Sequence, residues 1–258
     1  MDFGKLVEES FGYAKDGLVG HWVKWIVLII LGLLPMIPIV VGIVMGVVSL
    51  MAAPSMLLPT IILTIIVALI LSLPLMGYVF RIYRGASPAP EVDNWGLLFS
   101  DGFKLLVANI IYAIPIIIIG IVVFGSALLA IVMSSSKNIS NPGALMGMFG
   151  AVLFGVIILA IVAFIIWLIV ATACVRLART NSVGEAFNFG EIFSHIGKIG
   201  WVNYIVALII MGIIVGIVMF ILELIPYIGF ILVLIVTPLI AIFQARYLCL
   251  LYDSAGTA

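Results

Sequence analysis

The sequence predicts an all-α polytopic membrane protein of about six transmembrane helices, arranged as three helical hairpins that are each preceded by a short amphipathic interfacial helix. The first observation is composition: of 258 residues, 66% are hydrophobic and 9% are charged, whereas soluble domains are about 45–50% apolar and about 25% charged. The second is the recurrence of apolar runs of 20 or more residues, each long enough to cross a hydrocarbon core of about 30 Å. A net charge of zero gives no reason to expect a nucleic acid partner.

The first part of the chain is interpreted as an amphipathic helix followed by a hairpin. Apolar residues recur every three or four positions over residues 3–18, which suits a helix at the membrane surface. This helix either docks on the protein's own helices or is attracted to anionic lipid. A first span, Trp25 to Met51, and a second, Thr60 to Tyr83, follow. Pro35 and Pro38 remove two backbone donors from the first span, so we expect either a kink or a break that lines a cavity.

The rest of the chain repeats this order twice. A short helix from Asn94 to Lys104 leads into a third span, Leu105 to Met133, and a polar loop, Ser134 to Gly143, leads into a fourth, Leu145 to Leu177. A second short helix, Asn188 to Lys198, precedes a fifth span from Trp201 to Leu222 and a sixth from Gly229 to Leu251. All of these elements form one integral membrane domain.

The basic residues predict the orientation in the cell membrane. With six spans, Lys137 is the one basic residue on one side, and ten fall on the other: Lys5, Lys15, Lys24, Arg81, Arg84, Lys104, Arg176, Arg179, Lys198 and Arg246. Lysine and arginine near span ends are retained on the cytoplasmic face. We therefore expect both termini to be cytoplasmic. Because no small-residue cleavage site follows the first apolar run, we expect the N-terminal segment to be retained.

An internal repeat relates the two polar connectors. A shift of 94 residues aligns Asn94, Gly96, Phe99, Ser100 and Lys104 with Asn188, Gly190, Phe193, Ser194 and Lys198. At a shift of 95, Arg81-x-x-Arg84 aligns with Arg176-x-x-Arg179. The interpretation is three parallel units, approximately residues 1–84, 85–179 and 180–258, with Arg246 as the arginine of the third.

The central stretch resembles a known family. The residues that carry the resemblance are Gly77-Tyr78, Arg81, Arg84, Pro90, Asp93, Trp95, Leu98-Phe99, Asp101-Gly102, Lys104, Tyr112 and Pro115. They resemble the signature of an archaeal family of uncharacterised polytopic membrane proteins, a domain-of-unknown-function family. The resemblance implies about six membrane helices and an archaeal source, and it implies no biochemical activity. A looser similarity is to the multi-span regions attached to some bacterial glycerophosphodiester phosphodiesterases, but these 258 residues are expected to include no catalytic domain of that kind.

No motif in the sequence predicts catalysis, a cofactor or a metal site. His21 and His195 are the only histidines, and no spaced Cys/His/Asp cluster accompanies them, whereas a zinc site needs three or four convergent ligands. No nucleophile elbow or phosphate-binding loop is present. Cys174 and Cys249 are expected to be reduced thiols rather than a disulfide.

Several polar residues remain as candidates, each with two interpretations. Arg81, Arg84, Arg176 and Arg179 either contact lipid phosphate or anchor the chain by ordinary positive-inside placement. Asp101 either caps a helix or pairs with Lys104, or it binds a ligand, and His195 stands at its repeat position. Asn109 and Asn203 are expected to bond between helices. Glu223 is either an intramembrane functional carboxylate or part of an exposed turn.

Two classes of function fit these observations. The first is a non-catalytic component that organises membrane lipids or partner membrane proteins through its interfacial helices, and it is not an enzyme. The alternative is a transporter or permease-like protein for an apolar or amphiphilic solute, since the first span contains two prolines. A lipid-directed enzyme would require Asp101, Lys104 and His195 to converge.

Overall fold

The computed structural model describes residues 1–133, 142–226 and 228–256, and every regular element in those ranges is a helix. The α-helices are α1 (Phe3–Leu18), α2 (Trp22–Leu33), α3 (Met36–Ala52), α4 (Leu57–Tyr83), α5 (Trp95–Met133), α6 (Pro142–Thr180), α7 (Phe189–Ile199), α8 (Trp201–Glu223) and α9 (Gly229–Asp253). Six segments within them are long and apolar enough to cross a membrane. The expected all-helical, multi-pass fold class is therefore confirmed. Lys137 and most of the predicted polar loop lie outside the described residues.

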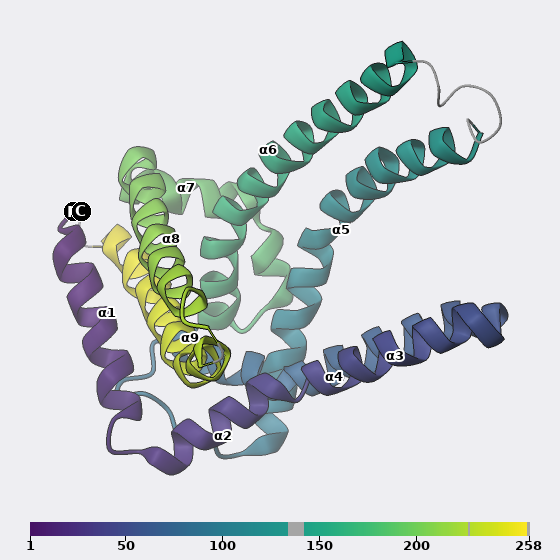
Figure 1. The fold of residues 1–258 in the computed structure, drawn as a ribbon. Coiled ribbons are helices and arrows are strands. Elements are labelled where there is room, and N and C mark those ends of the chain that lie inside the picture. Colours follow the sequence, from purple (N-terminus) through teal and green to yellow (C-terminus); the bar gives the residue numbers. More distant parts are fainter. Residues whose placement is uncertain (134–141, 227, 257–258) are drawn as a thin grey trace. The chain divides into compact units, whose positions relative to one another are not determined.

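The chain forms two compact units. Unit 1 contains residues 1–107 and 172–258, and unit 2 contains residues 108–171, the adjoining parts of α5 and α6. Within unit 1, α9 contacts α1, α2, α4, α7 and α8 (Figure 1). Several of its residues are fully buried, among them Ile242, Ala245 and Tyr247. The core of unit 1 is thus assembled around the last membrane-spanning helix.

The helix α1 lies on α9, as the docking interpretation of residues 3–18 expects. Its apolar face, including Leu6, Ala14 and Leu18, is buried, while Asp2 caps its first turn by accepting a hydrogen bond from the Lys5 backbone nitrogen at 3.0 Å. Tyr13 lies under the Arg246 guanidinium, 4.7 Å from the ring centroid. The amphipathic pattern therefore faces protein on its apolar side.

The first span is interrupted at Pro35, where the sequence predicts a kink or a break. α2 ends at Leu33 and α3 begins at Met36, and both Leu34 and Pro35 keep right-handed helical backbone angles. The interruption is therefore a one-turn irregularity of the kind that proline causes. Beyond it, α3 and α4 run side by side as a hairpin (Figure 1). A Cβ added at Gly42 would lie 2.1 Å from the Thr64 hydroxyl, so glycine is required for this close approach.

The contact between α4 and the start of α5 is backbone against backbone. A Cβ added at Gly77 would lie 1.9 Å from the Leu98 carbonyl oxygen, and one at Gly102 would lie 2.0 Å from the Leu73 carbonyl oxygen. Real Cβ atoms do not approach carbonyl groups this closely. Both glycines are therefore required for the two helices to touch.

The structure differs from the prediction at the first connector. Residues 95–104 are the opening turns of α5, which continues without a break to Met133, rather than a separate interfacial helix. The second connector does form the separate helix α7, which ends at Ile199 and is followed by Gly200 with φ of +91°. The residue 94 positions earlier is Leu106, and leucine favours continuation of a helix where glycine permits a left-handed turn. α5 and α7 nevertheless begin 94 residues apart, at Trp95 and Phe189.

Candidate functional site

The two Arg-x-x-Arg motifs meet at one end of unit 1, which we call the charged end. A Cβ added at Gly85, immediately after the first motif, would lie 2.7 Å from the Arg179 guanidinium. Gly85 has φ of +89°, a conformation that glycine adopts readily. Arg84 donates a hydrogen bond to the Asn181 side-chain oxygen at 2.8 Å, two residues beyond the second motif. The repeat remains a prediction, but the ends of its two arginine motifs lie close together.

Asp101 is the centre of the first cluster. Its side chain is 2% exposed, and Arg84 donates to its two carboxylate oxygens at 2.7 and 2.9 Å. Lys104 lies 3.5 Å from Asp101 and donates to Asn181 at 2.9 Å. Two cations thus share one buried carboxylate and one amide oxygen. The Asp101–Lys104 pair expected from the sequence is present, but the bidentate partner is Arg84.

The other three arginines of the motifs also face carboxylates. Arg81 donates to Asp93 at 2.6 Å and to the carbonyl oxygens of Glu91, Asp93 and Asn94. Arg179 donates to both oxygens of Asp253 at 2.7 and 2.8 Å. Arg176 donates from Nε and Nη2 to the same carboxylate oxygen of Glu185, and it lies 3.9 Å from Glu191.

This pairing bears on the lipid-phosphate interpretation of the arginines, which stays a prediction. A guanidinium whose hydrogen-bonding edge is occupied by a carboxylate has few donors left for a lipid phosphate. The hydrogen bond from Arg176 holds the pKa of the Glu185 carboxyl below its usual range, so Glu185 stays ionised at neutral pH. The arginines therefore form hydrogen bonds and ion pairs that join connectors to helix ends.

Arg246, the predicted arginine of the third unit, has different surroundings. Within the described ranges its guanidinium lies over the Tyr13 ring rather than against a carboxylate, a cation–π contact. Burial raises the pKa of Tyr13 to about 12 despite the nearby Arg246 charge, so the phenol is neutral and donates to the Ala86 carbonyl at 2.7 Å. Lys24, with 4% of its side chain exposed, pairs with Glu91 at 2.8 Å. The first connector, between α4 and α5, is therefore held by side chains of α1 and α2.

His195 does not join Asp101 and Lys104. Its Nε2–H donates to the Tyr252 carbonyl oxygen at 2.9 Å, and its ring stacks on the Tyr252 ring with centroids 3.8 Å apart. Asn203, near the start of α8, donates to the carbonyl oxygen of Ile199, the last residue of α7, at 3.5 Å. Glu223 is the exposed last residue of α8, and Asn109 is half-buried in unit 2. The convergence that a lipid-directed enzyme would require is not formed.

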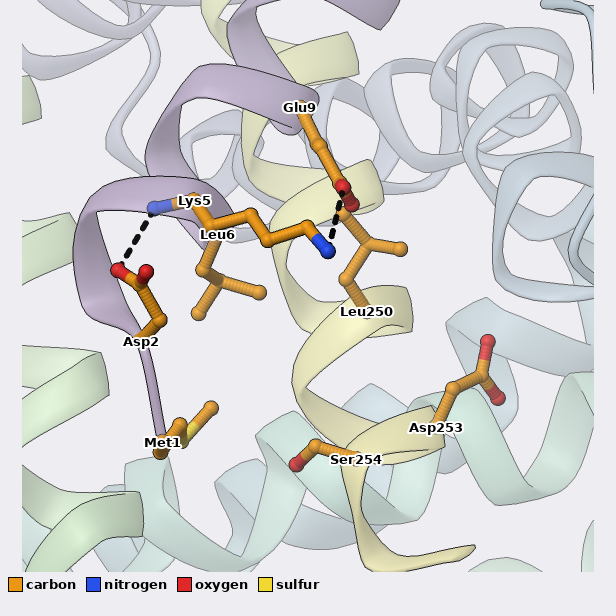
Figure 2. Close-up of a pocket in the computed structure, with 8 residues that line it drawn as sticks. All are labelled: Met1, Asp2, Lys5, Leu6, Glu9, Leu250, Asp253 and Ser254. Atoms are coloured by element: carbon orange, nitrogen blue, oxygen red, sulfur yellow. Dashed lines mark hydrogen bonds and ion pairs between the residues drawn. The ribbon is translucent and has the colours of Figure 1, made fainter. Parts of the chain in front are cut away.

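A hollow between the start of α1 and the end of α9 was missed by sequence reasoning. It has a volume of about 340 Å³ and is lined by Met1, Asp2, Lys5, Leu6, Glu9, Leu250, Asp253 and Ser254 (Figure 2). Its charges have partners within the chain: Asp2 caps α1, Lys5 lies 3.7 Å from Glu9, and Asp253 pairs with Arg179. Because these charges pair within the chain, we interpret the hollow as a gap where two helix ends meet rather than as a ligand site.

Sequence reasoning also missed the acidic partners and Asn181. Asn181 has φ of +55°, which asparagine tolerates better than most residues, and the Thr-Asn-Ser sequence after Arg179 is a turn signal that marks it. The described residues contain no group of three or more His, Cys, Asp or Glu side chains placed to hold a metal ion.

The contact of His195 with Tyr252 predicts a pH dependence of stability. Burial lowers the pKa of His195, and the charges of Lys198 and Arg176 add to this, outweighing the Tyr252 carbonyl and Asp253, which raise it. The folded protein therefore favours the neutral ring, whereas the unfolded chain takes up a proton as the pH falls through about 6.5. We expect stability to fall as the pH is lowered from about 7.5 to about 5.5.

Thermal unfolding in detergent across this pH range tests the dependence. A His195→Gln variant should lose most of the slope that the natural chain shows. His21→Gln is the matched control, since it removes the chain's other histidine and leaves the contact with Tyr252 intact. An unchanged slope in His195→Gln would contradict the assignment.

Comparison with known proteins gives one match. Residues 60–245 match the family model described as "Protein of unknown function (DUF4013)". No curated protein and no solved structure matches the chain.

Proposed function

Since the chain belongs to the family of proteins of unknown function DUF4013, we propose a role from its structure: a non-catalytic integral membrane component that organises membrane lipids at its charged end. The observation that carries the proposal is a row of exposed aromatic side chains. Phe189, Phe193 and Trp201 are 45%, 41% and 45% exposed. The ring centroids of Phe189 and Phe193 lie 6.3 Å apart, and those of Phe193 and Trp201 lie 5.9 Å apart. We call these three residues the aromatic row.

The opposite face of α7 fixes the aromatic row in place. Ile192, Ile196 and Ile199 are buried in unit 1, so the exposed rings are not simply the apolar half of an undocked helix. Near the start of α5, Trp95, Phe99 and Phe103 are exposed at successive helical turns. Aromatic side chains at this level of a membrane protein favour the headgroup region, which supports lipid contact at both connectors.

The proposal includes an orientation and a location. An even number of spans and the concentration of basic residues near the charged end favour a cell-membrane protein with both termini in the cytoplasm. Fusing a reporter to each terminus in turn tests this orientation. If either terminus were found on the outer side of the membrane, the orientation would be contradicted. Partner membrane proteins form the second class of contact, for which the exposed rings offer large, rigid surfaces.

Replacing the aromatic row should weaken lipid ordering. In nanodiscs that contain a phospholipid with a spin label close to its headgroup, Phe189→Ala/Phe193→Ala should lower the motionally restricted fraction about two- to tenfold, because aromatic contacts contribute roughly 0.5–1.5 kcal/mol each beyond burial. Phe124→Ala/Phe220→Ala is the matched control, since it removes two rings that are 52% and 63% exposed inside the spans. Equal losses in the two variants would refute the role of the aromatic row.

A permease-like role for an apolar or amphiphilic solute is the second candidate. The observation that favours it is the interruption of the first span at Leu34 and Pro35, since irregular backbone at membrane depth often lines a solute path. Solute flux into vesicles that contain the purified protein tests it, and vesicles without the protein are the control.

A further inference from the structure

An apolar pocket lies inside unit 1 where α2, α4, α8 and α9 meet. Its volume is about 290 Å³, and its walls include Leu28 and Gly32 of α2, Leu75 of α4, Met219 of α8, and Phe230 and Ala241 of α9. All four helices belong to candidate membrane spans. From the structure we infer that this pocket binds one hydrocarbon chain of a membrane lipid. The inference goes beyond the proposed function, because none of the lining residues belongs to the aromatic row.

The chemistry of the walls excludes a polar ligand group. The one hydroxyl among the lining side chains belongs to Thr237, and it donates to the Val233 carbonyl of its own helix at 2.6 Å. No lining side chain is charged. A polar ligand group would lose its hydrogen bonds to water without replacement, at a cost of about 1–3 kcal/mol or more. Only an apolar segment fits these walls.

The size of the pocket matches a chain rather than a small gap. A dry, apolar cavity of about 150 Å³ is large enough to bind benzene, and this pocket has about twice that volume. Its walls extend from Leu28 to Met36 along the first span, which is about 12 Å at 1.5 Å per residue. An elongated ligand fits this shape.

The local backbone explains why the helices leave room here. Leu33 and Met36, on either side of the interruption of the first span, both line the pocket, as does Pro238 within α9. Proline is a common cause of kinks in helices, and a kink prevents continuous close packing along a neighbouring helix. A void without atoms forfeits dispersion contacts, and the material available at this depth of a membrane is lipid chain. Met36 and Met219 supply flexible walls that adapt to such a chain.

Photocrosslinking in nanodiscs tests the inference. A glycerophospholipid with a diazirine at the end of one acyl chain should label lining residues such as Met219 and Phe230, whereas the same lipid with its diazirine on the headgroup should not. Gly32→Leu and Ala241→Leu, which fill the pocket, should each reduce acyl-chain labelling there about tenfold. Gly120→Leu is the matched control: a Cβ at Gly120, in unit 2, meets no atom within 4 Å, and this variant should keep the labelling.

Three results would overturn the inference. One is undiminished labelling in both pocket-filling variants, with their folding verified by thermal unfolding. Another is labelling spread evenly over all exposed apolar side chains of the natural chain. The third comes from a competition experiment, which is used if both variants fail to fold. Added hexadecane, which has no headgroup, should compete with the labelled lipid for the pocket of the natural chain. Unchanged labelling in the presence of hexadecane would contradict the inference. Loss of lipid ordering in the aromatic variants is measured separately, so the two proposals can fail independently.

Discussion

Replacing Gly102 by alanine is expected to lower the free energy of unfolding by about 2 kcal/mol or to prevent folding of unit 1. The added methyl group would lie 2.0 Å from the Leu73 carbonyl oxygen and 3.0 Å from the Gly77 nitrogen. Both atoms belong to the α4 backbone, which cannot rotate away as a side chain would. α4 and α5 must therefore separate at the level of the buried carboxylate of Asp101, the preceding residue.

The intrinsic helix preference acts in the opposite direction. Alanine is favoured over glycine by about 1 kcal/mol inside a helix, so an open site should be stabilised or unaffected by the same change. Gly96, also in α5, is such a site, because a Cβ there meets no atom within 4 Å. Chemical or thermal unfolding in detergent compares the two variants. Equal stability of Gly102→Ala and Gly96→Ala would show that the backbone contact does not constrain the fold, and Gly77→Ala should behave like Gly102→Ala.

Replacing Asp101 by alanine is expected to destabilise the protein by about 3 kcal/mol. The change removes the one carboxylate shared by Arg84 and Lys104 and leaves two cations facing each other at a largely buried position. Breaking a buried pair by removing one partner is more costly than removing both. Asp101→Ala/Arg84→Ala should therefore recover part of the loss, in a double-mutant cycle measured by unfolding.

Asp93 supplies the matched control for this experiment. Its side chain is 70% exposed and pairs with Arg81 at 2.6 Å, so Asp93→Ala should cost no more than about 1 kcal/mol. If Asp93→Ala and Asp101→Ala were equally destabilising, burial would not explain the importance of the Asp101 cluster.

The positions of the helices were predictable because they depend on local pattern. The apolar periodicity of residues 3–18 gave α1, and the prolines near residue 35 marked the interruption between α2 and α3. The continuous helix α5 was not predicted. Its continuity depends on Leu106, which occupies the position that Gly200 occupies in the second connector. The three-unit repeat, the archaeal source and the absence of enzymatic activity stay predictions.

The candidate site was predictable only in part. Asp101 and Lys104 are three residues apart, so helix geometry alone brings them together. The bonds from Arg84 and Lys104 to Asn181, and from Arg179 to Asp253, span 74 to 97 residues, and such contacts depend on how helices pack. The arginines were therefore recognised from the sequence, while the carboxylates that neutralise them were not.

The seating of α1 on α9 has a consequence for synthesis. Residues 3–18 are translated well before their partner, residues 229–253. At about 5–20 residues per second, roughly 10–40 s pass between the two. During that interval the apolar face of α1 cannot pack against α9. We expect it to bind the membrane surface instead, as amphipathic helices do. We expect α9 to replace lipid at this face once it has been made, so that the apolar face of α1 depends on the surrounding membrane only until α9 is in place.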